Sequence, residues 1–217
     1  MRVLAACEES QAVTIAFRKK GIECWSCDIM ESSGGHPEWH IKGDVSKIIN
    51  DDWDMIIAFP PCTHLSKAGA VFWEEKRKDG RQKKALDFFM LFLNNDCPKI
   101  AIENPPGIMS TLPKWALKIG LENMPHGWKN YDQIIHPWWF GDEKNKPTCL
   151  WLKGLPPLIA TNIVGRGEIK TDRRGKKYST WFNSMPKGGI PERQKIRSQT
   201  FPGIAEAMAI QWGQWLL

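Results

Sequence analysis

The sequence predicts an α/β fold, with one domain built on a doubly wound, mostly parallel β-sheet. Three observations lead to this prediction. Apolar runs of strand length recur along the chain, stretches with helical periodicity separate them, and several runs end at an acidic residue or a proline. Strands that alternate with helices in this way form parallel sheets whose two faces are both covered. A chain of 217 residues is also long enough to bury a substantial core.

The first expected unit is a strand, a polar turn and a helix. The strand is residues 2–6, and the turn is residues 7–10. Ser10 is the predicted N-cap of a helix over residues 11–20, and Gly21 closes that helix. The opening apolar segment is too short for a signal peptide and no run is long enough to span a membrane, so we expect a cytoplasmic protein.

Two further strands each end at an acidic residue. A strand over residues 22–27 leads to Asp28, and a short strand over residues 41–45 carries Asp44 near its end. In nucleotide-binding α/β sheets an acid at this edge accepts hydrogen bonds from ribose hydroxyls. The two acids therefore indicate a nucleotide-type site, although a solvated aspartate is also common where a strand ends.

The fourth strand presents a cysteine. Residues 54–62 begin as an apolar run that stops at Pro60 and Pro61 and then reaches Cys62. Proline lacks the N–H that a strand ladder needs, so Cys62 is expected just beyond the carboxyl end of the strand. Ligands and chemistry collect at that edge of open α/β sheets. The alternative is that Cys62 is simply a buried thiol, since free cysteine usually behaves as a small core residue.

A polar stretch over residues 63–81 follows the cysteine and contains several basic residues. Loops of this length are usually functional or disordered, so we expect a mobile loop that closes over a nucleic acid, with an unstructured insertion as the alternative. A helix over residues 82–94 comes next, because apolar residues recur there near the 3.6-residue period.

The fifth strand repeats the pattern of the fourth. Residues 99–102 are largely apolar, and Glu103, Asn104 and Pro105 follow them directly. If the fourth and fifth strands are parallel neighbours, Cys62 and Glu103 lie at the same edge of the sheet. A thiol beside a carboxyl group indicates a nucleophile with an acid partner.

Six cysteines in a chain of this length are too few for a disulfide scaffold. Cys24 and Cys27 have the spacing of half a metal site, but no second pair of ligands completes it. We interpret them as residues on opposite faces of the second strand and expect no metal.

Basic residues are concentrated in one segment. Residues 153–197 hold eleven Lys or Arg against three Asp or Glu, a net +8, so the rest of the chain sums to −2 in a total of +6. Such segregation is typical of a protein with a polyanionic partner, although a solvated charged loop is the plainer explanation. We therefore expect three parts: a cofactor-binding and catalytic core over residues 1–152, a small basic segment facing nucleic acid over residues 153–197, and a C-terminal helix over residues 198–217 that packs back on the core.

Two motifs resemble a known family. Pro60-Pro61-Cys62 and Glu103-Asn104-Pro105 resemble the Pro-Cys and Glu-Asn signatures of the cytosine carbon-5 DNA methyltransferases, particularly small phage-type members. Residues 198–209 resemble the closing motif of that family, and the resemblance covers most of residues 1–152 and the final twenty residues. It implies the Rossmann-like fold of the S-adenosylmethionine-dependent methyltransferases, with S-adenosylmethionine as cofactor. A phage-encoded member would act in the host cytoplasm.

The resemblance implies covalent catalysis on a DNA cytosine. Cys62 would add to carbon 6 of the ring, and Glu103 would bind or protonate ring nitrogen 3. The base would be flipped out of a duplex or arrive in single-stranded DNA. The cofactor contacts so implied are Ala6, Cys7, Glu8, Glu9, Ser10, Asp28, Ile29, Asp44, Val45, Phe59, Pro60, Gln199 and Thr200. The substrate contacts implied by the motifs and the basic segment are Pro61, His64, Ser66, Asn104, Pro105, Gln133, Lys146, Arg173, Arg174, Lys176 and Lys177.

The chain departs from the family pattern in three places. The turn after the first strand has no glycine, Pro105 stands where the family commonly has valine, and the arginine motif that supports the base is not evident. Gln133 and Lys146 are the candidates for the role of that arginine. Three alternatives follow: transfer of a modified methyl group, action on RNA or a nucleotide, or a catalytically silent DNA-binding protein that retains the fold. A monomer is favoured.

Overall fold

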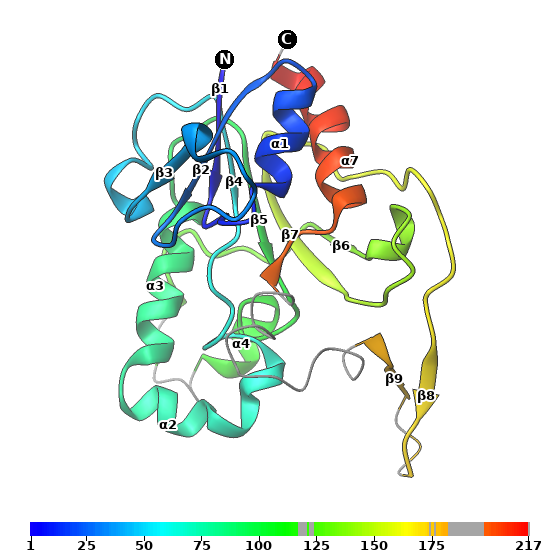
Figure 1. The fold of residues 1–217 in the computed structure, drawn as a ribbon. Coiled ribbons are helices and arrows are strands. Elements are labelled where there is room, and N and C mark those ends of the chain that lie inside the picture. Colours follow the sequence, from blue (N-terminus) through cyan, green and yellow to red (C-terminus); the bar gives the residue numbers. More distant parts are fainter. Residues whose placement is uncertain (117–120, 122–123, 174, 176, 182–197, 217) are drawn as a thin grey trace.

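A seven-stranded sheet forms the centre of the molecule (Figure 1). The computed structural model describes residues 1–116, 121, 124–173, 175, 177–181 and 198–216. The strands are β1 (Arg2–Ala6), β2 (Glu23–Asp28), β3 (His40–Lys42), β4 (Met55–Ala58), β5 (Ile100–Asn104), β6 (Gln133–Ile135) and β7 (Thr148–Lys153). Their order is β3-β2-β1-β4-β5-β7-β6.

The sheet is mostly parallel, as predicted. Strands β1 to β5 pair in parallel, and β7 is antiparallel to both of its neighbours, β5 and β6. This is the doubly wound order 3-2-1-4-5-6 with one antiparallel strand inserted before the edge. The α/β, Rossmann-like fold class predicted from the sequence is therefore confirmed.

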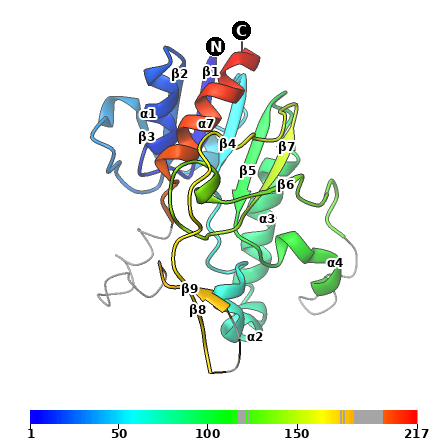
Figure 2. The same cartoon turned by 90° about the vertical axis from the view of Figure 1, so that its right-hand side faces the viewer.

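Helices cover both faces of the sheet (Figures 1 and 2). On one face α1 (Ala12–Lys19) and α7 (Pro202–Gly213) bury their apolar residues against β1, β4 and β7. On the other face α3 (Arg81–Leu93) packs against the opposite sides of the same strands. The shorter helices are η1 (Pro37–Trp39), η2 (Val45–Lys47), η3 (Lys67–Phe72), α2 (Trp73–Lys78), η4 (Met109–Thr111), α4 (Leu112–Trp115), η6 (Pro137–Trp139) and η7 (Gln214–Leu216).

The apolar run of the fourth strand is buried on both sides. All four residues of β4 are buried, because a central parallel strand has a helix layer above and below it. The interpretation of Cys24 and Cys27 is confirmed as well, since Cys24 belongs to the core on the α1 and α7 side and Cys27 to the core on the α3 side.

Two local predictions are wrong. The segment 63–81 is not an irregular loop, because η3 and α2 occupy residues 67–78. Ser10 does not cap the first helix with its side chain; the carboxylate of Glu8 accepts hydrogen bonds from the backbone N–H groups of Val13 (2.5 Å) and Thr14 (3.2 Å) instead. A buried carboxylate from the preceding turn thus takes the place of the expected hydroxyl cap.

A small antiparallel ribbon stands apart from the main sheet. It consists of β8 (Ile169–Thr171) and β9 (Lys177–Ser179), and it lies at the end of the molecule that also holds α2 and α4 (Figures 1 and 2). Among the residues that the structure describes, no helix is long and apolar enough to cross a membrane.

Candidate active site

Two strand ends carry the residues of greatest chemical interest. Strands β4 and β5 are parallel neighbours, with Ala58 opposite Ile102. Glu103 is therefore at the carboxyl end of β5, and Cys62 is four residues beyond the last residue of β4. The predicted shared edge of the sheet is confirmed by this pairing.

The loops that follow the two strands are joined by backbone hydrogen bonds. Ser66 forms an isolated antiparallel bridge with Gly107, and the N–H of Ile108 donates to the carbonyl of Leu65 at 2.7 Å. A Cβ atom on Gly107 would lie 2.2 Å from the Leu65 carbonyl oxygen, which no real side chain tolerates. Glycine is thus required for the close approach of the two loops. The sequence reading did not single out Gly107, although a glycine directly after Pro105 and Pro106 was the available signal.

Asn104 makes a second contact between the two strand ends, because its side chain binds the backbone of the loop that carries Cys62. Its Nδ2 donates to the carbonyl of Pro60 at 2.9 Å, and its side chain is 1% exposed. The sequence assigned Asn104 to the substrate, whereas its side chain binds the backbone two residues before Cys62. Its role in the structure is to position the cysteine loop.

Cys62 begins a tight turn. Its carbonyl accepts hydrogen bonds from the N–H groups of Leu65 (3.0 Å) and Ser66 (2.8 Å), and its side chain remains partly exposed. Lys76 of α2 is 7% exposed and donates from Nζ to the carbonyl of Thr63 at 2.8 Å. A basic residue that was expected to hold DNA thus fixes the backbone next to the cysteine.

Glu103 is half-buried, and its surroundings shift the pKa of its carboxyl group in opposite directions. Burial raises the pKa of its carboxyl group, and the Lys146 ammonium and a hydrogen bond from Thr148 lower it, burial being the largest effect. Lys146 also lies over the ring of Phe201, with Nζ 5.6 Å from the ring centroid. The structure therefore places Lys146, a predicted substrate contact, close to Glu103. Thr148, which donates a hydrogen bond to Glu103, was not predicted from the sequence.

The other expected substrate residues divide into two groups. Pro61 is exposed and Pro105 is half-buried, while burial and the nearby Lys76 and Arg81 lower the pKa of His64. Gln133 is engaged elsewhere: its amide donates to the Leu158 carbonyl at 2.7 Å and accepts from the Leu158 N–H at 2.8 Å. Of the two candidates for the missing arginine, only Lys146 is thus placed beside Glu103.

Two of the four predicted basic contacts belong to the described part of the β8–β9 ribbon. Arg173 and Lys177 are exposed there, well separated in the sequence from the two strand-end loops. Arg174 and Lys176 lie outside the described residues.

The carboxyl ends of β1, β2 and β3 form a second group of candidate residues. Burial, followed by the negative charges of Asp28 and Asp44, raises the pKa of the Cys7 thiol, and the same effects raise the pKa of Cys27 to about 11. The two aspartates predicted to bind a nucleoside therefore lie close to the turn after β1. Asp28 accepts a hydrogen bond from the N–H of Met30, and Asp44 caps η2 by accepting from the N–H of Ser46, both at 2.9 Å.

The turn after β1 keeps its sharp shape without glycine. Cys7 adopts a left-handed conformation with φ 59°, and the following Glu8 turns inward to the start of α1. Glu8 is 3% exposed, and burial raises its pKa to about 7. Gln11 is fully buried and binds the backbone of His36, which fixes the turn against the segment after β2. The Glu8 side chain thus serves the turn itself.

The remaining cofactor candidates come from this turn, from other strand ends and from the segment before α7. The Phe59 N–H donates to the carbonyl of Ala6 at 2.9 Å, and Ile29 is 74% exposed beside Asp28. Val45 and Pro60 are buried, Glu9 and Ser10 are half-buried, and Gln199 and Thr200 precede α7. Glu9 accepts a hydrogen bond from the Ser33 hydroxyl.

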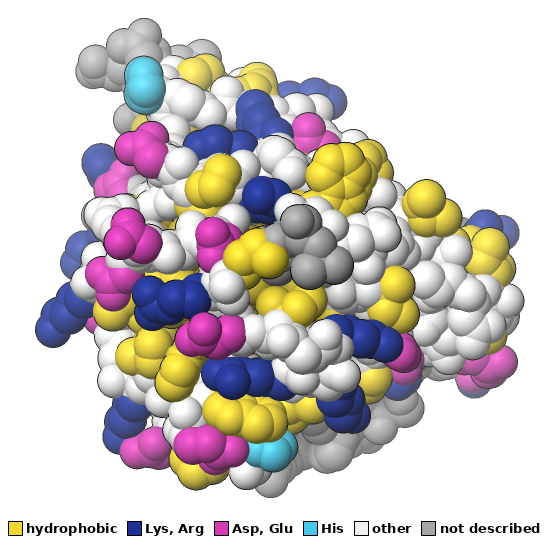
Figure 3. Space-filling model, turned by 90° about the horizontal axis from the view of Figure 1, so that it is seen from above, with side chains coloured by type: hydrophobic (Ala, Val, Ile, Leu, Met, Phe, Trp, Pro, Cys, Tyr) yellow, Lys and Arg dark blue, Asp and Glu magenta, His cyan; other side chains and the backbone are white. Residues whose placement is uncertain are grey.

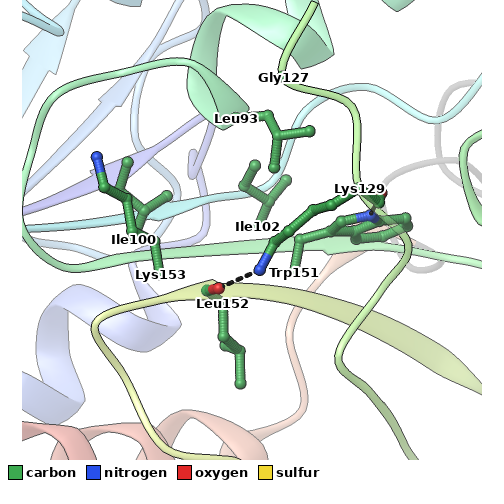
Figure 4. Close-up of a pocket in the computed structure, with 8 residues that line it drawn as sticks. All are labelled: Leu93, Ile100, Ile102, Gly127, Lys129, Trp151, Leu152 and Lys153. Atoms are coloured by element: carbon green, nitrogen blue, oxygen red, sulfur yellow. Dashed lines mark hydrogen bonds between the residues drawn. The ribbon is translucent and has the colours of Figure 1, made fainter. Parts of the chain in front are cut away.

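A cavity of about 180 Å³ is formed by residues that belong to neither group (Figure 4). It is lined by Leu93, Ile100, Ile102, Gly127, Lys129, Trp151, Leu152 and Lys153. None of these residues is a candidate site residue, and Ile100 is at the amino end of β5, the end opposite to Glu103. Its Lys129 is already bound to the Leu152 carbonyl and to Asp132. The cavity is therefore not part of the candidate active site.

Comparison with known proteins identifies structures of similar fold. No protein-family model and no curated protein matches the chain. A candidate DNA modification methyltransferase encoded within an E. coli prophage has 18% identity and a TM-score of 0.47, over 76% of this chain and 52% of that one. The S. pombe Dnmt2 methyltransferase has 17% identity and a TM-score of 0.43, over 72% of this chain and 50% of that one. The Entamoeba histolytica methyltransferase EhMeth has 17% identity and a TM-score of 0.48, over 76% of this chain and 57% of that one. The chain thus spans about half the length of these methyltransferases.

Proposed function

We propose that the chain is an S-adenosylmethionine-dependent DNA methyltransferase that acts on carbon 5 of cytosine. The observation that carries the proposal is the joining of two loops: the one with Cys62 and the one that follows Glu103 are bound together through Ser66 and Gly107. A thiol and a half-buried carboxyl group are thereby held at one sheet edge, which suits nucleophilic attack assisted by an acid.

The two side chains have complementary roles in this proposal. The Cys62 thiolate adds to carbon 6 of the ring, while the Glu103 carboxyl donates its proton to ring nitrogen 3 and so offsets the charge that the addition creates. Because burial raises the pKa of Glu103, the protonated acid that this step needs is favoured. Once carbon 5 carries the methyl group, its proton passes to solvent, the Cys62 thiolate departs, and nitrogen 3 returns its proton to Glu103, which completes the reaction. Lys146, which acts on Glu103 from the neighbouring loop, keeps the acid able to release its proton.

The edge formed by β1, β2 and β3 fits S-adenosylmethionine. Asp28 supplies an acceptor for the ribose, Asp44 supplies an acceptor for the adenine, and the exposed side chain of Ile29 offers the adenine an apolar surface. When bound, this cofactor would supply the methyl group to carbon 5. The residues that would hold it lie at the same carboxyl edge of the parallel sheet as Cys62 and Glu103.

One observation favours the alternative of a catalytically silent nucleic-acid-binding protein. The N–H groups of Val13 and Thr14 at the start of α1 are already bound by the Glu8 carboxylate. Free N–H groups at a helix N-terminus often bind an anionic ligand group, and here the carboxyl group of Glu8 occupies them instead. Calorimetry with S-adenosylmethionine separates the two functions, because a silent protein would not bind it.

A nucleoside assay tests the enzymatic proposal. The protein is incubated with S-adenosylmethionine and DNA, the DNA is digested, and the nucleosides are weighed by mass spectrometry. We expect 5-methylcytosine from the wild type, none from Cys62→Ser, and a loss of at least 100-fold for Glu103→Gln, in the range typical of general acid catalysis (~10²–10⁴-fold).

The matched control is Cys97→Ser, a thiol before β5 whose Sγ is bound to the carbonyls of Trp53 and Lys99 at the opposite edge of the sheet. It should retain activity, and circular dichroism should show each variant folded. Unchanged turnover in Cys62→Ser would refute the covalent mechanism. A cytosine product with a substituent other than methyl at carbon 5 would instead support transfer of a modified methyl group.

A further inference from the structure

Lys76 carries a buried positive charge that no acid neutralises. It is one of two buried residues of α2, and its side chain is 7% exposed. Within the described part of the chain its ammonium forms no ion pair, and its one hydrogen bond is to a backbone carbonyl. Lysine is almost never fully buried unless it is paired, because an ammonium removed from water costs free energy. The position of Lys76 therefore calls for a function.

The acids nearest to Lys76 in the sequence are already bound to other cations. They pair as follows: Glu74 with Lys78, and Glu75 and Asp79 with Arg81. Exposed charges elsewhere are arranged in a similar way, since Lys and Arg side chains lie beside Asp and Glu on the face near the amino ends of the strands (Figure 3). Lys76 differs from all of these, because it has lost water without gaining a carboxylate.

Two contacts hold the ammonium of Lys76 against the cysteine turn. Its Nζ donates to the carbonyl of Thr63 at 2.8 Å, one residue after Cys62, and lies 5.9 Å from the ring centroid of Phe72. Its charge also acts within this turn: burial, followed by the charge of Lys76 and then that of Arg81, lowers the pKa of His64. The ammonium is thus fixed beside the turn that begins at Cys62.

The other charged groups around the two joined loops are balanced by partners. They are His64 in the turn, Lys67 of η3, Asp79 and Arg81 before and at the start of α3, Glu103 of β5 and Lys146 before β7. Arg81 and Asp79 pair with each other. Lys146 acts on Glu103, and Lys67 acts together with Glu103 on the thiol of Cys149. An ionised Glu103 would oppose a second negative charge nearby, but burial raises its pKa and so favours the neutral acid.

We propose that Lys76 is the electrostatic partner of Cys62, and that its buried ammonium stabilises the thiolate that attacks the substrate. The thiolate is the nucleophilic form of cysteine, and a nearby lysine increases the fraction of it that is present at neutral pH. The S–H bond of Cys62 breaks, its proton passes to solvent, and the negative charge stays on sulfur beside the ammonium. The reaction thereby supplies the anion that Lys76 otherwise lacks.

Lys76 is a positioning residue in this proposal, since it acts through Cys62 and not on the substrate. The inference rests on the proposed function, in which Cys62 is the nucleophile, and it assigns the group that activates this nucleophile. It also explains why a lysine that costs stability occupies an inner position of α2.

The pH dependence of Cys62 alkylation tests the proposal without cofactor or DNA. Iodoacetamide reacts with the thiolate, and mass spectrometry of the peptide that contains Cys62 follows this one thiol at each pH. We expect the alkylation rate of the wild type to have its midpoint below the ordinary thiol pKa of about 8.5. Lys76→Met should raise the midpoint by about one pH unit, because an opposite charge nearby is lost.

Two conservative variants separate the charge of Lys76 from its contact with Thr63. Lys76→Arg keeps the positive charge and should keep a midpoint close to that of the wild type. Lys76→Gln keeps an N–H donor for the Thr63 carbonyl but carries no charge, so its midpoint should rise as in Lys76→Met. A residue that only held the backbone would be replaced by glutamine without a change in midpoint.

The matched control is Lys78→Met, which removes a positive charge from the exposed side of the same helix. It should leave the midpoint unchanged, because an exposed charge is screened by solvent and salt. In the nucleoside assay, Lys76→Met should lose up to about tenfold in methyl transfer near pH 7 and recover at higher pH, where more thiolate forms.

Four results would overturn the proposal: a wild-type midpoint at or above about 8.5, an unchanged midpoint in Lys76→Met, a wild-type midpoint in Lys76→Gln, or a midpoint in Lys76→Arg as high as in Lys76→Met. The first of these depends on no variant. A low midpoint that Lys76→Met raises would stand even if the nucleoside assay found no methyl transfer. Conversely, an ordinary midpoint would leave the roles of Cys62 and Glu103 to that assay.

Discussion

Neighbouring residues of β5 serve opposite faces of the sheet. Glu103 is opposite Leu150, which belongs to the core on the α1 and α7 side, whereas Asn104 is opposite Cys149 on the α3 side. Since consecutive side chains of a strand alternate, one dipeptide supplies both an acid for the site and an amide that holds the Pro60 carbonyl. The Glu-Asn pair is thus explained by strand geometry as well as by chemistry.

The buried Glu8 side chain should make the stability of the protein depend on pH. Burial raises the pKa of Glu8 from 4.5 to about 7, so the folded protein holds a proton there that the unfolded chain has already lost. The free energy of unfolding should fall as the pH rises between these values, by about 3 kcal/mol when complete. Glu8→Gln should remove this part of the pH dependence. Urea denaturation at pH 5 and pH 8 measures it.

The control for this measurement is Glu9→Gln, the adjacent acid, which is only half-buried and binds the Ser33 hydroxyl. It should keep the pH dependence of the wild type. The same dependence in Glu8→Gln as in the wild type would show that the Glu8 carboxyl does not hold a proton in the folded protein.

At the scale of elements, the site depends on how closely two loops approach. The segment after Cys62 is locally helical, through η3 and α2, and the buried Lys76 ties it back to Thr63. On the other side, Gly107 allows the loop after Glu103 to reach the Leu65 carbonyl. The spacing of thiol and carboxyl is therefore set by backbone contacts between loops that are far apart in the sequence.

Gly107→Ala should disrupt this spacing. The new Cβ would meet the Leu65 carbonyl oxygen at 2.2 Å, so one of the loops must shift. We expect a loss of stability of about 1–3 kcal/mol, as is typical of overpacking, with a larger proportional loss of methyl transfer. Thermal unfolding and the nucleoside assay measure the two effects.

Gly165→Ala is the matched control, because its Cβ would meet nothing closer than Glu143 Oε1 at 3.8 Å. It should change neither stability nor activity. Full activity in Gly107→Ala would mean that the close contact between the loops does not govern the site.

At the scale of the whole molecule, α7 closes the fold. It joins the end of the described chain to α1 and buries Ile204, Met208 and Trp212 against the sheet. Gly203 at its start allows the Phe140 carbonyl to approach to a distance that a Cβ atom would not permit. The helix thus connects the core, the loop after β6 and the base of the ribbon.

Two residues of α7 allow its contribution to be measured. Met208 is 0% exposed and Ile210 is 47% exposed, although both belong to the same helix. Met208→Ala should lower the free energy of unfolding by about 2–5 kcal/mol, because it leaves a cavity in the core. Ile210→Ala should change it by less than about 1 kcal/mol. Denaturant titration compares them, and equal losses would contradict the packing of α7 described above.

The sequence by itself determined the strands that carry the candidate residues and the edge at which those residues lie. Apolar runs, prolines and acids are local signals, and they sufficed to place Cys62, Glu103, Asp28 and Asp44 close to strand ends and to predict a mostly parallel sheet. Only the tertiary structure decided that β7 runs antiparallel between β5 and β6, that Glu8 turns inward, and that Asn104 holds Pro60. The helices within residues 63–81 also had to be seen, since their sequence is polar and lacks a clear apolar period. The pairing of β7 and the contact of Asn104 with Pro60 join segments that are distant in the sequence, and such contacts leave no periodic trace in it.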